Sequence, residues 1–264
     1  RTKGFVRRIV EEQYREQLKL GGKKELSGLG LIYCHSIEQY VRQILELDLT
    51  FAPFEYQESE KRHYTSFPLS SGERVYFGGI IDRVDKVGSR LRVVDYKTGS
   101  EETRMPKWDL LLDSKYKAIL QTLIYCAFLA ESGVPKDEIY PAIYMLRGDY
   151  GLMVRGKGYN PLVQLPLDTY GNASNSPEPP ESPSPVHASF LSEGNTSKGS
   201  GAKSPKKQKK LQTTLLSYAE AEAPFREVFI HGVLDELYDA STPFAQTPKE
   251  ENCRYCPFAL SCGR

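Results

Sequence analysis

Two aspartates and a lysine lie close together in residues 79–99, which read GIIDRVDKVGSRLRVVDYKTG. Asp82 lies in one run of alternating apolar residues, and Asp95 and Lys97 lie in the next run, beyond a Gly-Ser pair. Carboxylates bind hard cations such as Mg²⁺ or Mn²⁺, and a bound cation lowers the pKa of its water until that water can attack phosphorus. An ammonium group beside them can stabilise the charge that develops on a phosphate. These residues therefore predict a metal-dependent nuclease site.

The sequence around the Gly-Ser pair predicts a β-hairpin. Residues 75–87 and 90–98 are rich in β-branched and aromatic side chains, which favours strands. Glycine at the first central position of a two-residue turn suits a type II′ hairpin, and this turn fixes the register. In that register Val87 pairs with Arg90 and Asp82 directly faces Asp95.

Side-chain alternation along the two strands predicts that the three candidate residues share one surface. We expect that face to carry Ile80, Asp82 and Val84 from the first strand and Val93, Asp95 and Lys97 from the second. Facing carboxylates repel each other unless something compensates their charge, and a divalent cation would do so. On the opposite face we expect Asp85 and Arg92 to form a solvated ion pair.

The pattern G-x-x-D followed by D-Y-K-T-G resembles the PD-(D/E)XK nucleases of the RecB and AddB type. The resemblance implies that Asp82 and Asp95 bind metal and that Lys97 is catalytic, and we expect the main-chain carbonyl of Tyr96 to add a metal ligand. The fold that it implies is α/β, a restriction-endonuclease-like mixed sheet flanked by helices.

The same family carries a Q-x-x-x-Y motif on the next helix. Residues 114–130 have helical apolar periodicity and contain Gln121 and Tyr125 at this spacing. Because residues four apart share a helix face, the pair could lie over the site and contact DNA or a ligand. The alternative is an ordinary helix residue beside a buried phenol.

Two further residues are candidates for the metal site by resemblance. The family has a histidine on a helix before the hairpin, and His35 is a match, although Gly30 to His35 is one residue longer than the usual spacing. A partly exposed helix histidine without a metal role is the alternative. Glu60 matches the acidic residue that often opens the sheet. Because the chain begins with Arg1, we expect upstream residues in the parent protein, and weak activity of this fragment if the family histidine lies there.

The C-terminal segment contains Cys253, Cys256 and Cys262 in C-x2-C-x5-C spacing. We find no signal peptide and no 18-residue apolar run, so we expect a reducing, cytoplasmic location, no membrane association and metal ligation rather than disulfides. Thiolates at this spacing suit an iron–sulfur cluster or zinc. AddB-like and CRISPR-associated nucleases close their domain with a [4Fe-4S] cluster, so the resemblance favours iron.

The fourth ligand of such a cluster is open. Cys34 is a candidate, but it lies on the apolar face of a predicted helix at residues 29–47, where core packing is the alternative. Cys126 lies within the Q-x-x-x-Y helix and is expected to pack as well. An upstream residue of the parent protein is the remaining source.

Composition predicts three segments: a nuclease core at 1–170, a disordered Pro/Ser/Lys-rich insertion at 171–212, and a segment at 213–264 that completes the same domain. Residues 171–210 hold six of the 17 prolines, nine serines and six lysines, without an apolar period. Their Lys-rich end could grip phosphates or be a solvated linker. The other residues carry 29 basic and 31 acidic side chains, so DNA binding must use a local cleft.

The remaining patterns complete the expected fold. We expect a strand at 138–146, a pairing segment at 152–163 and a helix at 213–237. Five residues of that helix should face inward: Phe225, Val228, Phe229, Leu234 and Leu237.

Together the sequence predicts a Mg²⁺-dependent deoxyribonuclease that acts on single-stranded DNA or duplex ends. The resemblance implies a module of a RecB/AddB-like recombinational repair protein with a helicase partner, and an exonuclease activity of unspecified polarity. Two alternatives remain: a non-catalytic DNA-binding or scaffold module that keeps the fold, and a CRISPR-associated nuclease.

Overall fold

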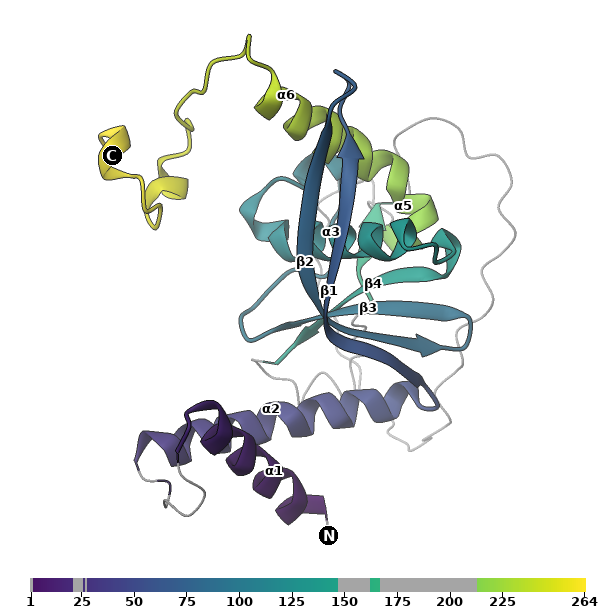
Figure 1. The fold of residues 1–264 in the computed structure, drawn as a ribbon, viewed down its shortest axis with the longest axis vertical. Helices are drawn as coiled ribbons and strands as arrows, with labels where there is room; N and C mark the ends of the chain where they lie inside the picture. Colours follow the sequence, from purple (N-terminus) through teal and green to yellow (C-terminus); the bar gives the residue numbers. More distant parts are fainter. Residues whose placement is uncertain (1, 21–25, 27, 147–161, 167–212) are drawn as a thin grey trace, which may run out of the picture.

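A four-stranded sheet lies at the centre of the computed structural model (Figure 1), which describes residues 2–20, 26, 28–146, 162–166 and 213–264. The strand order is β1–β2–β3–β4. Neighbouring strands are antiparallel except β3 and β4, which are parallel. The strands are β1 (Glu55–Pro68), β2 (Arg74–Val87), β3 (Arg90–Lys97) and β4 (Ile139–Met145). The expected insertion at 171–212 lies outside the described residues.

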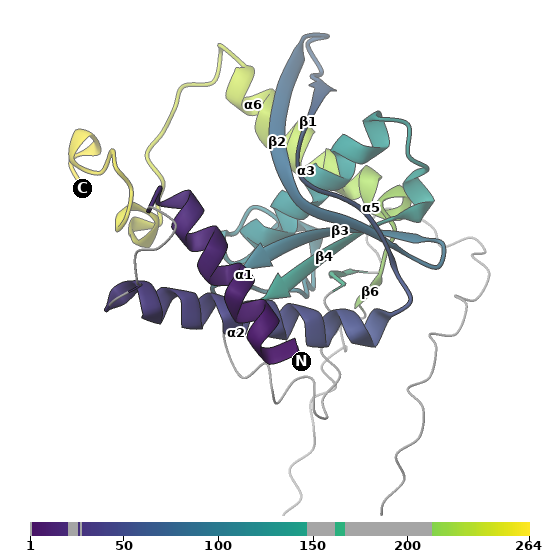
Figure 2. The same cartoon turned by 60° about the horizontal axis from the view of Figure 1, so that its bottom comes forward.

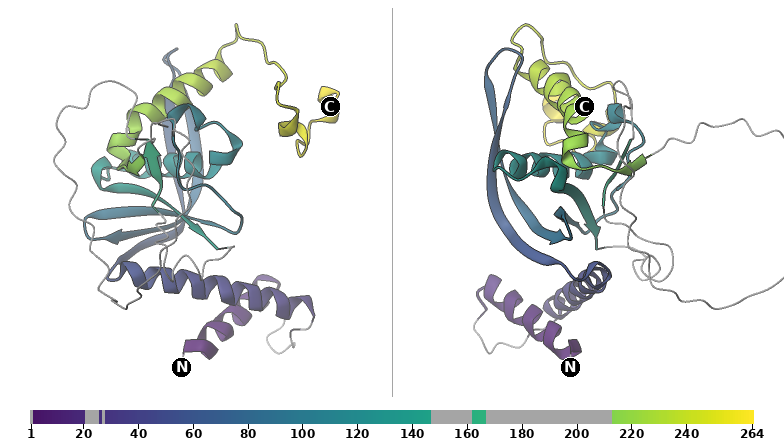
Figure 3. Two further views of the ribbon diagram at one scale, coloured as in Figure 1. Left: turned by 180° about the vertical axis from the view of Figure 1, so that it is seen from behind. Right: turned by 90° about the vertical axis from the view of Figure 1, so that its right-hand side faces the viewer.

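Helices cover both faces of this sheet, so the predicted mixed α/β architecture is confirmed. On one face lies α2 (Leu29–Phe51), with α1 (Thr2–Gln17) packed on its outer side (Figure 2). On the other face lie α3 (Lys117–Glu131) and α5 (Tyr218–Phe225), and α5 continues into the π-helix η4 (Arg226–Leu234) (Figure 3). The shorter elements are η1 (Trp108–Leu110), η2 (Ser114–Tyr116), η3 (Lys136–Glu138), β5 (Gln164–Pro166), β6 (Thr213–Leu215), α6 (Asp235–Tyr238), η5 (Glu250–Cys253) and η6 (Leu260–Cys262).

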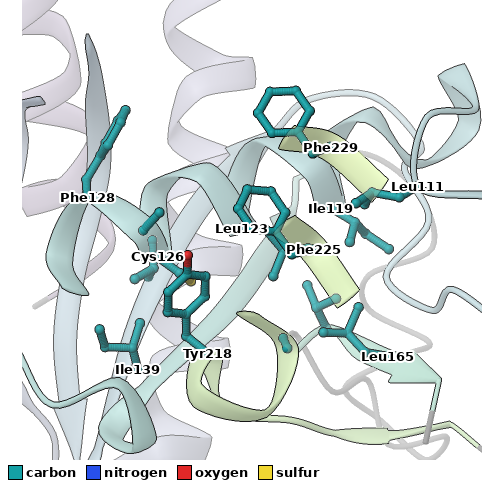
Figure 4. Packing of buried hydrophobic residues seen from close by; sticks show 14 of the residues in the cluster. Leu111, Ile119, Leu123, Cys126, Phe128, Ile139, Leu165, Tyr218, Phe225 and Phe229 are labelled. Atoms are coloured by element: carbon teal, nitrogen blue, oxygen red, sulfur yellow. The ribbon is translucent and has the colours of Figure 1, made fainter. Parts of the chain in front are cut away.

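Two apolar clusters sandwich the sheet. Val93 and Val94 are adjacent on β3 and both fully buried, but Val93 packs in the cluster under α3 and α5, whereas Val94 packs with Leu47 of α2. Figure 4 shows the first cluster, in which Leu123 and Phe225 meet. Burying such a side chain stabilises a fold by about 1.5–3 kcal/mol, so both helical layers hold β3 in place.

The hairpin predicted between β2 and β3 is confirmed. Of its two turn residues Gly88 alone has a positive φ, of 61°, which matches the type II′ turn. Val87 pairs with Arg90 as predicted. The ladder continues to the pair of Arg83 with Val94, where β2 leaves β3.

The predicted facing pair of Asp82 and Asp95 is therefore not a ladder pair. The ladder between β1 and β2 is also interrupted at Asp82, where Glu60 of β1 has a φ of 50°. Because β2 is unpaired on both sides here, strict alternation breaks. Ile80, expected beside Asp82 on the core face, is 38% exposed, and Ile81 is buried instead.

The remaining differences come from contacts distant in sequence. Local patterns did not predict α1 and β1, and residues 213–215 form a strand against β5 rather than the start of a helix. Leu237 is 49% exposed because α6 extends past the core, whereas Phe225, Phe229 and Leu234 are buried as expected. Most of the pairing segment at 152–163 lies outside the described residues. None of the described helices has the length and apolar composition that a membrane crossing requires.

Candidate active site

The two aspartates reach the same end of β3 from different strands. Asp95 lies near the carboxyl end of β3 and is 1% exposed. Asp82 lies on β2 where the ladder opens, and its Oδ2 accepts a hydrogen bond of 2.8 Å from the backbone N–H of Tyr96. The carboxylate of Asp82 thus accepts the hydrogen bond that a backbone carbonyl would accept in a regular sheet. It lies beside Tyr96, the residue next to Asp95.

Lys97 joins this pair to α3. Its Nζ donates to Oδ1 of Asp95 at 3.1 Å and lies 2.8 Å from Oδ2. The same Nζ donates to Oε1 of Gln121 at 2.8 Å, and Nε2 of Gln121 donates to the hydroxyl of Tyr125 at 2.7 Å. Side-chain hydrogen bonds therefore connect Asp95, Lys97, Gln121 and Tyr125 across β3 and α3, and Asp82 of β2 joins them through the backbone N–H of Tyr96.

The buried position of Asp95 changes the pKa of its carboxyl group. Its pKa is raised to about 6, with burial as the largest cause; the hydrogen bond and charge of Lys97 lower the pKa, and the charges of Asp82 and Glu101 raise it. A carboxylate that is difficult to ionise in the metal-free chain is one that a cation would stabilise.

The donor set fits a hard divalent cation. Oδ2 of Asp95 is buried and receives no hydrogen bond from the described part of the chain, and Lys97 reaches it only as an ion pair. No three His, Cys, Asp or Glu side chains of the described residues are placed to hold a metal together. Mg²⁺ keeps several waters and needs only one or two protein carboxylates, whereas structural zinc needs four protein ligands. Asp82 and Asp95 are two carboxylates of the kind that Mg²⁺ needs.

The structure does not add His35 or Glu60 to this group. Both side chains are exposed, His35 on α2 and Glu60 on β1. Glu60 nevertheless lies opposite Asp82 where the ladder is interrupted, in a left-handed conformation that is rare for a residue with a side chain.

Sequence reasoning missed Glu101 as a neighbour of the site. Its side chain is 12% exposed, forms an ion pair of 3.5 Å with Lys117, and contributes to the raised pKa of Asp95. The available signal was an acidic residue four positions after Lys97. Its direction depends on the loop after β3, which has no periodic pattern.

The expectation of a solvated pair of Asp85 and Arg92 is wrong. Asp85 and Arg92 are 0% and 1% exposed, and Nε and Nη2 of Arg92 donate to the two oxygens of Asp85 at 2.6 and 2.8 Å. The reason is α2, which covers this face and places the ring of Phe51 4.4 Å from the Arg92 guanidinium.

A second buried pair extends this network to α2. Arg83 Nη1 donates to Asp48 at 2.7 Å, and Arg83 Nη2 lies 2.6 Å from Asp85. The Arg83 guanidinium also donates to the hydroxyl of Tyr96 at 3.2 Å. Because Arg83 follows Asp82 and Tyr96 follows Asp95, the network supports the backbone of both candidate metal ligands from the opposite face.

The cysteines fall into two groups. Cys253 and Cys256 are partly exposed and Cys262 is exposed, within a C-terminal segment that lies away from the sheet (Figure 1). Cys34 is buried against α1, where burial raises its pKa, and Cys126 is a fully buried residue of α3. The described structure therefore brings neither of them to the C-terminal three.

The fold and this site define a class of protein. A model of the PD-(D/E)XK nuclease superfamily matches residues 4–263, and the chain belongs to that superfamily, with its restriction-endonuclease-like fold.

Two curated relatives are more specific. The chain is 37% identical over 83 residues to an ATP-dependent helicase/deoxyribonuclease subunit of Clostridium tetani, and 34% identical over 102 residues to the protein of the same name from Acetivibrio thermocellus. These matches cover 29% and 36% of this chain but only 7% and 8% of the relatives. The chain therefore corresponds to a small part of such a protein.

Proposed function

We propose that the chain is a Mg²⁺-dependent deoxyribonuclease module. The observation that carries the proposal is the position of Lys97 Nζ, which contacts both the buried Asp95 carboxylate and Gln121. Asp82 accepts a hydrogen bond from Tyr96, the residue between Asp95 and Lys97. A buried carboxylate next to an ammonium group is suited to hydrolysing a phosphodiester with a bound cation.

Each residue has a distinct role in this proposal. Asp82 and Asp95 would hold the cation, with the main-chain carbonyl of Tyr96 as a further ligand; when bound, the cation would supply an activated water and shield the phosphate charge. Lys97 steadies the phosphate oxygens as negative charge develops. Gln121 and Tyr125 hold the ammonium group in place through their hydrogen bonds.

We further propose that the module acts on DNA ends, as an exonuclease within a larger repair protein that works with a helicase. The two relatives, whose names join a helicase to a deoxyribonuclease, support this context. The near-neutral charge outside residues 171–210 supports a local cleft rather than a broad DNA-coating surface.

Cleavage of end-labelled single-stranded and duplex DNA with Mg²⁺ tests the catalytic proposal. Asp95→Asn and Lys97→Ala should each lower the cleavage rate by about 10²-fold or more, because each removes a group that acts on the transition state. Binding of the same DNA in EDTA should persist, and circularised DNA should resist an enzyme that needs ends.

Lys86→Ala is the matched control. Lys86 lies on the same hairpin and also forms an ion pair, 3.1 Å from Glu138, but at the far end from the site. It should keep wild-type cleavage. DNA binding without any metal-dependent cleavage would instead favour the non-catalytic DNA-binding or scaffold module.

We also propose that Cys253, Cys256 and Cys262 bind an iron–sulfur cluster, with zinc as the alternative. The three thiols would supply three of the four ligands that a [4Fe-4S] cluster takes, and in the described structure neither Cys34 nor Cys126 lies with them. Anaerobic purification should give a brown protein with broad visible absorbance. Colourless protein with stoichiometric zinc would contradict the iron assignment.

A further inference from the structure

A cavity of about 280 Å³ opens between β2 and α3, beside the proposed catalytic group. Its walls are mainly apolar and aromatic: Phe77, Leu120, Ile124, Tyr125 and Phe128. Gln121 also lines it, and the same Gln121 accepts the hydrogen bond from Lys97. One side chain therefore separates the cavity from the catalytic ammonium group.

Gly79 shapes the wall of this cavity on β2. A Cβ at this position would lie 2.9 Å from Cε2 of Phe128 and 3.1 Å from Cε1 of Tyr125. Only glycine therefore lets the backbone of β2 come this close to the two rings, whose centroids are 5.8 Å apart. In Figure 4, Phe128 lies at the edge of the core cluster, away from Phe225 and Phe229.

We propose that this cavity binds one unstacked base of single-stranded DNA next to the bond that is cut. This inference rests on the proposed function, which brings a DNA backbone to Asp95 and Lys97. The cavity is slightly smaller than the roughly 300 Å³ at which drug-sized sites begin, so it suits one planar ring system. Aromatic and apolar walls bind any base through its faces, which gives sequence-tolerant binding.

The charge at the cavity mouth suits the nucleotide that carries such a base. Lys117 lines the mouth, and its exposed ammonium group lies 3.5 Å from Glu101. The Lys117 side chain is 68% exposed, so its ammonium group can turn from Glu101 toward a phosphate at the cavity. A duplex keeps its bases stacked and paired, so the cavity favours single-stranded DNA or a frayed end.

The experiment measures how much affinity the bases add. Binding of labelled dT12 is compared in EDTA with binding of a uniformly abasic oligonucleotide of the same length. Both carry the same number of phosphates. Because each is uniform along its length, it does not matter which nucleotide lies at the cavity. We expect dT12 to bind wild type more tightly, and Ile124→Ala and Gly79→Ala to lower that preference about tenfold, because stacking of one base contributes on that order.

Ile9→Ala is the matched control. It makes the same change as Ile124→Ala, but Ile9 is 41% exposed on α1 and does not line the cavity. It should keep the wild-type preference for dT12. Ile124→Ala guards against misfolding of Gly79→Ala, because it removes atoms and creates no clash.

The outcomes separate the two proposals. If the preference for dT12 is the same in wild type and both cavity variants, or is absent in wild type, the base site is wrong, even where Mg²⁺-dependent cleavage is found. If the variants lose the preference but wild type never cleaves DNA, the base site stands and the nuclease proposal fails. Absence of both DNA binding and cleavage overturns both.

Discussion

The fold buries the carboxylate of Asp95, which makes its ionised form unfavourable. Its carboxylate is 1% exposed, and burial is the main reason that its pKa rises to about 6. Lys97 compensates in part, but Asp82 and Glu101 add negative charge on the same side. The metal-free site therefore has an excess of negative charge, which a divalent cation would neutralise.

This predicts a specific pH dependence for the stability of the metal-free chain. Because folding raises the pKa of Asp95 from 3.8 to about 6, the folded state binds more protons between these values, and the free energy of unfolding falls as pH rises through that window. Above it the penalty is constant, up to about 3 kcal/mol at roughly 1.4 kcal/mol per pKa unit. Asp95→Asn should remove the penalty and be the more stable protein at pH 7.5 in EDTA, in part offset by its lost ion pair.

Urea unfolding at pH 4, 5, 6 and 7.5 checks this prediction. The exposed Asp137→Asn is the control and should follow wild type at every pH. Added Mg²⁺ should stabilise wild type and leave Asp95→Asn unchanged. Parallel profiles for wild type and Asp95→Asn would contradict the role of burial.

At the scale of elements, the hairpin of β2 and β3 could be predicted because its determinants are local. Gly88 selects the turn, and the turn sets the register of Val87 with Arg90. The Q-x-x-x-Y helix follows from its own periodicity. The environment of Asp85 could not be predicted in this way, because it depends on where α2 packs, and no local pattern encodes that position.

Because the charges between α2 and the sheet are buried, we expect substitution of Asp85 to lower the free energy of unfolding much more than substitution of its neighbour Lys86. Asp85→Ala leaves the guanidinium groups of Arg83 and Arg92 buried without this partner, and loss of one member of a buried ion pair costs about 3–5 kcal/mol. Lys86→Ala removes the neighbouring, partly exposed ion pair to Glu138 and should cost less than about 1 kcal/mol. Denaturant midpoints for the two variants compare them directly, and similar losses would mean that the Asp85 network is solvated in solution.

The same network links stability to the site. Arg83 contacts Tyr96 and lies next to Asp82, so Asp85→Ala should also loosen the metal ligands. A higher Mg²⁺ concentration for half-maximal cleavage, at a temperature where the variant is folded, is the expected sign. An unchanged Mg²⁺ requirement would show that the hairpin alone fixes the two aspartates.

At the scale of the whole molecule, apolar packing holds the core together, whereas the C-terminal segment with the three cysteines lies outside the apolar clusters. The main apolar cluster extends along the chain to Leu234, and no described residue beyond it belongs to a core cluster. The later segment presents exposed Phe244 and Leu260, and an ion pair of 3.6 Å between Lys249 and Asp113 connects it to the core side. The sequence predicts the thiols by their spacing, but not this separation, because spacing carries no information on packing.

We therefore expect loss of the proposed iron–sulfur cluster to leave the core folded. A chain in which Cys253, Cys256 and Cys262 are all replaced by serine should lose bound iron, and residues 240–264 should be cleaved faster in limited proteolysis, while the unfolding midpoint of the core stays unchanged. Cys126→Ser should show the opposite pattern, because it places a hydroxyl at a fully buried apolar position and costs about 1–3 kcal/mol, yet keeps the iron. If iron loss instead lowered the midpoint of the core as much as Cys126→Ser does, the cluster would belong to the same cooperative unit as the nuclease fold, and the C-terminal segment would have to pack on the core once metal is bound.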